Sequence, residues 1–185
     1  SGHVKIQDLT SNEMTKLTEG KNQLSETDTT EVKFSVEKWN RDATQLIARS
    51  KQGLWLIDRT DGSVERFMEF DPEDKKAPKY SVLEWAADGK TLFLAYNATD
   101  TWDRGVFQYD FNSEQLKELF RSTALYRSWQ LSENGSRWTY QYSDGDRPDE
   151  IFVADVSLNN KQQITDLNPW IKEKKFTKTE LVKYL

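Results

Sequence analysis

Short runs of alternating apolar and polar residues dominate this chain and recur at a nearly fixed spacing. Alternation at every second position is typical of a β-strand with one buried face. Four runs end in an acidic residue, and a further apolar residue stands nine positions after each acid, so the strand that follows repeats in register. The runs are Val4–Asp8, Leu54–Asp58, Val106–Asp110 and Ile151–Asp155, followed by Leu17, Phe67, Leu119 and Ile164.

A second motif precedes each of the last three runs. In this motif an apolar residue stands three positions before an acid or amide. The acid or amide falls at Asp42, Asp88 and Asn134, at intervals of 46 residues. Side chains of this kind cap turns by bonding to the backbone, and we favour that role over a metal or catalytic one. The small residues that follow suit a tight turn, and the apolar residues four positions after the acid or amide are expected to point inward. These are Ala43, Gly89 and Gly135, then Leu46, Leu92 and Trp138.

A period of this length with several short strands per unit is typical of β-propeller blades. The sequence therefore predicts an all-β fold, a partial β-propeller of about three and a half four-stranded antiparallel blades with a C-terminal tail. Residues 1–20 supply the third and fourth strands of a half blade, 31–78, 79–123 and 124–168 are complete blades, and 169–185 form the tail. The expected first strands are 32–36, 80–85 and 126–131, the second 44–49, 91–96 and 137–142, the third 53–58, 105–110 and 150–155, and the fourth 64–70, 115–120 and 161–165.

Turn and loop signals lie between these strands. Residues 20–30 are polar and rich in Thr, which predicts a connection, and the charged, proline-bounded segment 71–78 separates two blades. Asp61-Gly62 predicts a hairpin turn, because glycine accepts a positive φ without steric cost.

Composition excludes several classes of protein. Seven Trp, seven Tyr and nine Phe provide material for a core. A net charge of −5 gives no general attraction to nucleic acid or to an anionic membrane, and neither is expected as a partner. Without Cys there is no thiolate nucleophile, disulfide or Cys-based zinc site. No apolar run is long enough to span a bilayer.

The blade pattern resembles the propeller domain of the prolyl oligopeptidase family of serine peptidases. The residues that carry this resemblance are the apolar-x-x-Asp-Gly turns, the strands that end in Asp, and Gln163-Ile164-Thr165-Asp166-Leu167-Asn168-Pro169. This last segment, with Glu180-Leu181-Val182-Lys183-Tyr184 further on, is similar to the junction at which the family's propeller returns to its hydrolase domain. Tyr142-Ser143 and Arg147–Val153 are similar to the last blade of the acylaminoacyl peptidase and dipeptidyl peptidase IV-like branches.

The resemblance implies a parent enzyme whose hydrolase domain carries Ser, Asp and His beneath a propeller of seven or eight blades. This chain has no Gly-x-Ser-x-Gly elbow, and its single histidine is His3. We therefore assign no catalytic, cofactor-binding or metal residue, and expect the chain to be catalytically silent. Its first strands would border a channel that admits peptide substrates and excludes folded proteins. The alternative is a free-standing propeller that binds a protein or glycan partner.

Four weaker candidates lie in loops. Asp144, Asp146, Asp149 and Glu150 gather oxygen ligands suited to calcium, although their spacing is not that of an EF-hand, and a plain hairpin loop is favoured. Trp102 could stack on a carbohydrate or peptide, but a Trp folded over its own blade is favoured. The glycosylation sequons at Asn97 and Asn134 are attributed to chance, and the Lys172–Lys175 run to a solvated tail.

Open sheet edges at both ends of a partial propeller predict self-association, in which two chains would complete a ring of about seven blades. Residues 176–185 could instead fold back as an extra strand that shields one edge. The compartment is left open by the absence of Cys, with a periplasmic or secreted location favoured over a cytoplasmic one.

Overall fold

The computed structural model describes residues 3–18, 32–144, 147–174 and 182. These residues form β-strands, together with one short 3-10 helix, η1 (Pro169–Glu173). The chain divides into two compact units, residues 1–77 and 78–185. The expected connection at 20–30 lies outside the described residues, as does the proposed strand at 176–185 except for Val182.

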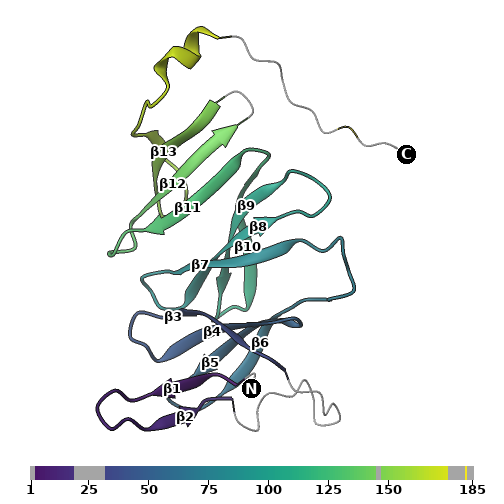
Figure 1. Cartoon of the computed structure of the whole chain (residues 1–185), viewed down its shortest axis with the longest axis vertical. Coiled ribbons are helices and arrows are strands. Elements are labelled where there is room, and N and C mark those ends of the chain that lie inside the picture. The colour runs from purple at the N-terminus through teal and green to yellow at the C-terminus, as the bar shows by residue number, and fades with distance from the viewer. Residues whose placement is uncertain (1–2, 19–31, 145–146, 175–181, 183–185) are drawn as a thin grey trace. The chain divides into compact units, whose positions relative to one another are not determined.

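The first unit contains two antiparallel sheets (Figure 1). Among the residues that the structure describes, β1 (Lys5–Gln7) pairs only with β2 (Met14–Lys16). The second sheet has four strands in chain order, so each strand pairs with the next one along the sequence. These strands are β3 (Ser35–Trp39), β4 (Gln45–Ser50), β5 (Gly53–Asp58) and β6 (Val64–Glu69).

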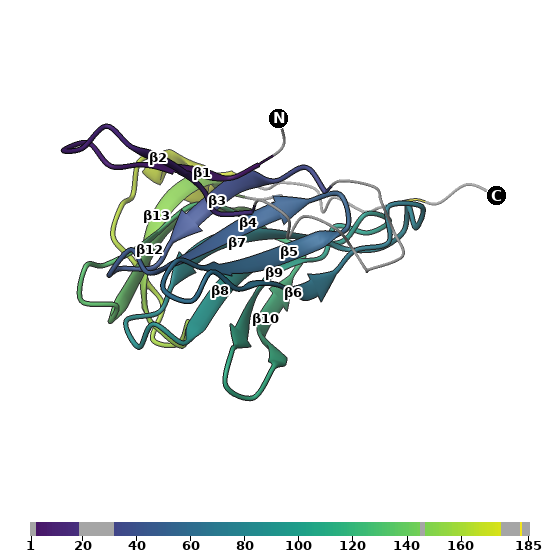
Figure 2. The same ribbon diagram turned by 90° about the horizontal axis from the view of Figure 1, so that it is seen from below.

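The second unit contains two further four-stranded antiparallel sheets, again with strands in chain order, and Figure 2 shows the first of them from a second direction. That sheet comprises β7 (Lys79–Trp85), β8 (Thr91–Asn97), β9 (Arg104–Asp110) and β10 (Gln115–Ser122). The other comprises β11 (Leu125–Leu131), β12 (Arg137–Asp144), β13 (Arg147–Asp155) and β14 (Gln162–Gln163).

Three four-stranded meanders and one two-stranded sheet confirm the prediction of an all-β partial β-propeller. Three strands differ notably from the expected bounds. β13 begins at Arg147, three residues before the expected start at 150. β3 begins at Ser35 instead of Val32, because Val32 is buried among apolar side chains before the ladder starts. β14 has two residues instead of the five expected at 161–165, because the chain beyond it bonds to a side chain of β13, as described below.

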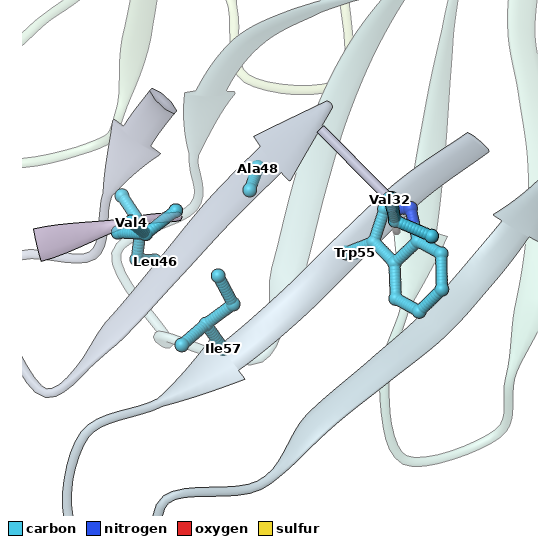
Figure 3. Close-up of a cluster of buried hydrophobic side chains, with 6 residues drawn as sticks. All are labelled: Val4, Val32, Leu46, Ala48, Trp55 and Ile57. Carbon is cyan, nitrogen blue, oxygen red and sulfur yellow. The ribbon is translucent and has the colours of Figure 1, made fainter. Parts of the chain in front are cut away.

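The core of the first unit lies between the two-stranded sheet and the β3–β6 sheet. Figure 3 shows Leu46 and Ala48 on β4 and Trp55 and Ile57 on β5. Val4 and Val32 complete this buried cluster, and the Phe34 ring packs edge-on against Trp55 with centroids 5.3 Å apart. Burial of a large apolar side chain contributes about 1.5–3 kcal/mol, so a few such residues hold the two sheets together.

The core of the second unit is aromatic and lies between its two sheets. Phe93 of β8 packs edge-on against Trp138 of β12, with ring centroids 5.1 Å apart. Trp138 has the position that Leu46 and Leu92 hold in the other two sheets, and all three side chains are at most 1% exposed. The prediction that these repeat positions point inward is confirmed.

The predicted turn caps are also present. The Asp88 carboxylate accepts hydrogen bonds from the backbone N–H groups of Lys90 and Thr91, at 2.8 and 2.9 Å. Asp42 accepts corresponding bonds from Thr44, and Asn134 from Ser136. The small residue after each cap has a positive φ, of 56° at Ala43, 66° at Gly89 and 70° at Gly135.

The acid that ends each third strand caps the hairpin that follows it. Asp58 accepts hydrogen bonds from the Thr60 hydroxyl at 2.6 Å and from Gln45 Nε2 at 2.9 Å, and these bonds lower its pKa. At Asp110 the backbone N–H groups of Ser113 and Asn112 lower the pKa in the same way. The recurrent acids therefore have a structural role.

The fourth strands of the first two complete sheets carry the apolar residue nine positions past the acid as a β-bulge. Phe67 is the extra residue on β6 and Leu119 the extra residue on β10. Each bulge brings a carbonyl over the first part of the third strand. A Cβ on Gly53 would lie 2.0 Å from the Met68 carbonyl oxygen, and one on Gly105 would lie 2.2 Å from that of Phe120. Glycine is required at both positions.

Candidate functional site

The first strand of every complete sheet carries a β-bulge at the same position of the repeat. The extra residue is Glu37 on β3 and Leu83 on β7, 46 residues apart, and on β11 Ser128 and Trp129 together lie opposite Tyr140 at the corresponding position of the repeat. A bulge re-aims side chains and is common beside functional sites. In the second unit β7 and β11 are in contact, which brings two of these first strands together.

The bulge on β11 is the most unusual of the three. Ser128 has a φ of 52°, which a residue with a side chain rarely adopts in a strand. Its hydroxyl donates a hydrogen bond to Gln141 Oε1 on β12, at 3.1 Å. Arg127 and Gln130 on either side are exposed, and Arg127 forms an ion pair with Asp149 at 3.5 Å. This strand therefore presents strained backbone and polar side chains to solvent, a combination associated with binding sites.

A catalytic triad is not present among the described residues. His3, the only histidine in the sequence, lies in the first unit with Nδ1 3.3 Å from the Thr18 hydroxyl. No acid orients its ring in the described hydrogen bonds, so it lacks the arrangement that activates a serine.

The loop proposed for calcium is arranged differently from a metal site. Asp144 accepts a hydrogen bond from the Tyr142 hydroxyl at 2.8 Å, Asp149 pairs with Arg127, and Glu150 is directed toward residues 165–167. Within the described ranges no three acidic or histidine side chains gather as metal ligands. Gly145 and Asp146 lie outside those ranges.

The remaining loop candidates have ordinary structural partners. Trp102 is 41% exposed, so it is less covered by its own sheet than expected. Asn97 accepts a hydrogen bond from Arg104 Nη1 at 2.9 Å, and Lys172 pairs with Asp166 at 2.6 Å. No helix in the described part of the chain has the length and apolarity needed to cross a membrane.

An aromatic cluster joins the two sheets of the second unit and holds a lysine at its margin. Lys161 Nζ lies 4.5 Å from the centroid of Phe120 on the neighbouring sheet. Although the residue as a whole is exposed, partial burial lowers the pKa of Lys161. Burial also raises the pKa of Tyr140 to about 12, and burial together with the Asp144 hydrogen bond raises that of Tyr142 to about 12.

In the last sheet a glutamate replaces the required glycine. Glu150 stands five residues before the strand-ending Asp155, as Gly53 and Gly105 stand before Asp58 and Asp110. Its side chain is buried and accepts hydrogen bonds from the Thr165 hydroxyl and from the backbone N–H of Leu167. Thr165 also accepts a bond from the backbone N–H of Ile151, at 2.8 Å. These side-chain bonds replace a fourth-strand ladder and direct the chain into η1.

A pocket of about 450 Å³ opens where β14 ends. The lower part of β13, the loop after β14 and the helix η1 form its wall, which includes three cations, two acids, two amides and two apolar residues. The lining residues are Arg147, Pro148, Glu150, Gln163, Asp166, Asn168, Ile171, Lys172 and Lys174. The repeat pattern did not predict this pocket, although the change from Gly53 and Gly105 to Glu150 marks its position.

Solved structures with a similar fold are β-propeller proteins of low sequence identity. Oligogalacturonate lyase from Vibrio parahaemolyticus superposes with a TM-score of 0.64 at 11% identity, over 90% of this chain and 47% of that one. TolB from Acinetobacter baumannii superposes with a TM-score of 0.57 at 13% identity, over 88% of this chain and 37% of that one. The chain is part of a β-propeller.

A third similar structure is the extracellular domain of a protein described as a one-component system from B. thetaiotaomicron. It superposes with a TM-score of 0.50 at 16% identity, over 89% of this chain and 20% of the other protein. The chain spans less than half the length of each of these three structures. No protein-family model matches the sequence, and neither does any curated protein. These likenesses concern the fold alone.

Proposed function

We propose that this chain is the non-catalytic β-propeller segment of a prolyl oligopeptidase-type serine peptidase, where it controls the access of peptides to a hydrolase domain. The observation that carries the proposal is the equivalent bulge on the first strand of all three complete sheets, at Glu37, at Leu83 and at Ser128-Trp129. In a propeller the blades surround a central channel, and first strands border it. A recurrent distortion on those strands would modify the channel wall at the same point of each blade.

The chemistry of β11 suits an extended peptide. Arg127, Ser128 and Gln130 are exposed and offer a cation, a hydroxyl and an amide. Such groups can bond to a peptide backbone without selecting one side chain. A narrow channel lined in this way would pass flexible peptides and stop folded proteins, which is the role expected of the propeller in the parent enzyme.

Exposed apolar residues at the end of the last sheet favour contact with a neighbouring domain. Ile164, Leu167 and Trp170 are 55%, 66% and 55% exposed, and η1 has no buried residue. Large apolar side chains that are exposed so close together in the sequence are candidates for a protein interaction surface. The bonds from Glu150 fix where the chain leaves the sheet, so this surface has a defined direction in which to meet a hydrolase domain.

The test is to read the coding sequence beyond Leu185 and to assay its complete product. We expect a nucleophile elbow downstream and cleavage of short peptide anilides by the complete polypeptide, with no cleavage by residues 1–185 alone. The same peptide placed inside a folded domain should resist cleavage. A stop codon directly after Leu185, or hydrolysis by this chain itself, would refute the proposal.

A free-standing binding propeller is the second candidate. The fold similarity to TolB, together with the one to the extracellular domain, favours it and also favours a periplasmic or secreted location. It predicts further blades upstream and no hydrolase domain downstream. Fractionation of cells that express the native gene would test the location, and a cytoplasmic product would contradict it.

A further inference from the structure

The pocket beside β13 contains positive charges that the described structure leaves uncompensated. Its two acids are already engaged, since Asp166 pairs with Lys172 at 2.6 Å and Glu150 accepts bonds from Thr165 and Leu167. Arg147 and Lys174 form no ion pair with any described carboxylate. The chain as a whole carries a net charge of −5, so this local excess of cations runs against its overall balance.

The polar groups of the wall are suited to a carboxylate. Arg147 offers a planar guanidinium that can bond both oxygens of a carboxylate, and Lys174 adds a mobile ammonium. The side-chain amide of Asn168 takes part in no described hydrogen bond and offers a further donor. Pro148 and Ile171 supply apolar wall between these groups. A few convergent polar groups on a partly apolar wall are typical of a ligand site.

The neighbouring strand edge favours an extended ligand. β14 pairs only with Phe152 and Val153, and one further backbone bond joins Ile164 to Ile151. Within the described ranges, no fourth strand pairs with the segment of β13 from Arg147 to Asp149, which runs beside the pocket. Exposed strand edges bind extended peptides through their backbone groups, and pockets alongside supply selectivity.

We propose that the pocket between β13 and η1 binds an extended peptide segment through a carboxylate, with Arg147 and Lys174 as the groups that recognise the charge. The carboxylate can belong to a peptide C-terminus or to an Asp or Glu side chain, because the chemistry is shared. This site is separate from the first strands β7 and β11, and the proposal does not depend on the access role proposed above.

Fluorescence anisotropy with labelled hexapeptides tests this site on the whole chain. The probes are a peptide with alternating Glu residues and a free C-terminus, the same peptide amidated, and an amidated version with Gln in place of Glu. We expect the neutral version to bind at least tenfold more weakly, and comparison of the first two probes separates terminal from side-chain recognition. Equal binding of the neutral peptide would overturn the proposal.

Variants locate the site. Arg147→Gln and Lys174→Gln should each weaken binding of the acidic peptide about tenfold, as expected for loss of a charge-assisted hydrogen bond. Lys117→Gln, an exposed lysine on β10, is the matched control and should leave binding unchanged. Loss of binding in Lys117→Gln equal to that in the pocket variants would indicate general charge attraction and refute the proposal, as would absence of binding to the unsubstituted chain.

Amide hydrogen exchange distinguishes strand addition from binding of the carboxylate alone. With the acidic peptide bound, we expect slower exchange at Arg147 and Asp149, while β10 remains unchanged. Inorganic phosphate at matched ionic strength should compete for the charge without slowing those amides. Slower exchange elsewhere in the second unit, with none at 147–149, would place the ligand at another site and contradict the proposal.

Discussion

The backbone N–H of Leu167 donates a hydrogen bond of 2.8 Å to Oε1 of Glu150. This bond joins the last sheet to the segment that follows β14. The side chain of Glu150 stands where the other two complete sheets have Gly53 and Gly105 and no room for a Cβ. We expect Glu150→Ala to destabilise the chain by about 1–3 kcal/mol, because it leaves the Leu167 N–H and the Thr165 hydroxyl without their acceptor. Urea unfolding measures this. Glu65→Ala, at an exposed position of β6, should change stability by less than about 0.5 kcal/mol, and an equal loss in both variants would argue against the role of Glu150.

Gly105 is the subject of a second prediction. Gly105→Ala would place a Cβ 2.2 Å from the Phe120 carbonyl oxygen, so one strand must move, and we expect a loss of about 3 kcal/mol. Gly89→Ala is the comparison, because a Cβ there meets nothing within 4 Å. Its φ of 66° still costs about 1 kcal/mol. Thermal unfolding of both variants tests the difference, and a larger loss in Gly89→Ala would contradict the steric account.

Stability should fall in acid because of the strand-ending aspartates. Hydrogen bonds lower the pKa of Asp58 and of Asp110 below the ordinary value of 3.8. The stabilisation they provide is complete above that value and is lost as the pH falls through it toward the folded-state pKa. We expect Asp58→Asn to be less stable than the unsubstituted chain at pH 7 and to lose less stability on acidification. Denaturant midpoints at pH 7, 4 and 3 measure this, and identical pH dependence in the variant would exclude the contribution of Asp58.

Stability should also fall in alkali, through the buried tyrosines. Burial raises the pKa of Tyr140 from 10.0 to about 12. Ionisation of the unfolded chain therefore begins first, and stability present below pH 10 is lost as the pH rises toward 12. Absorbance at 295 nm should show late-titrating tyrosine that disappears in part in Tyr140→Phe. Titration of every tyrosine near pH 10 in the folded chain would be inconsistent with this burial.

The open edge of β1 leads to a prediction about association. β1 pairs with β2 on one side and with no other strand among the described residues. Unpaired edges recruit strands from other molecules. The backbone bonds of Val4 and Asp8 face β2, so by alternation the N–H of Lys5 faces the open edge. We expect sedimentation equilibrium to show dimers at high concentration, and Lys5→Pro, which removes a donor from this edge, to shift the balance toward monomers. A monomer at every concentration tested would refute association through this edge.

The repeat made the sheets predictable, while the interruptions of the repeat were not. Apolar positions such as Leu46, Leu92 and Trp138 recur at 46 residues because each faces an equivalent core, so strand order and facing followed from the sequence. Val32 was misplaced within β3, since a buried residue before a strand and one inside it give the same alternation.

The bulges and the pocket lie beyond what alternation reveals. One extra residue at Glu37 or Leu83 leaves the apolar pattern almost unchanged and is visible only through strand pairing. The pocket depends on Glu150 bonding to a segment fifteen or more residues away. The sequence signal for the pocket was the loss of the recurrent glycine. That signal could be interpreted only after the structure showed that the Phe120 carbonyl in the neighbouring sheet leaves no room for a side chain at Gly105.

The first-strand bulges join the core of a sheet to its exposed first strand. Leu83 and Trp129 lie at the bulges of the second unit and pack against its buried aromatic cluster, while Glu37 in the first unit forms an ion pair with Arg49. Substitution of Leu83 or Trp129 would therefore disturb the packing of the second unit. Arg127, Ser128 and Gln130, which are exposed beside the β11 bulge, lie outside that core, so the ligand preference of this strand can change there while the blade keeps its packing.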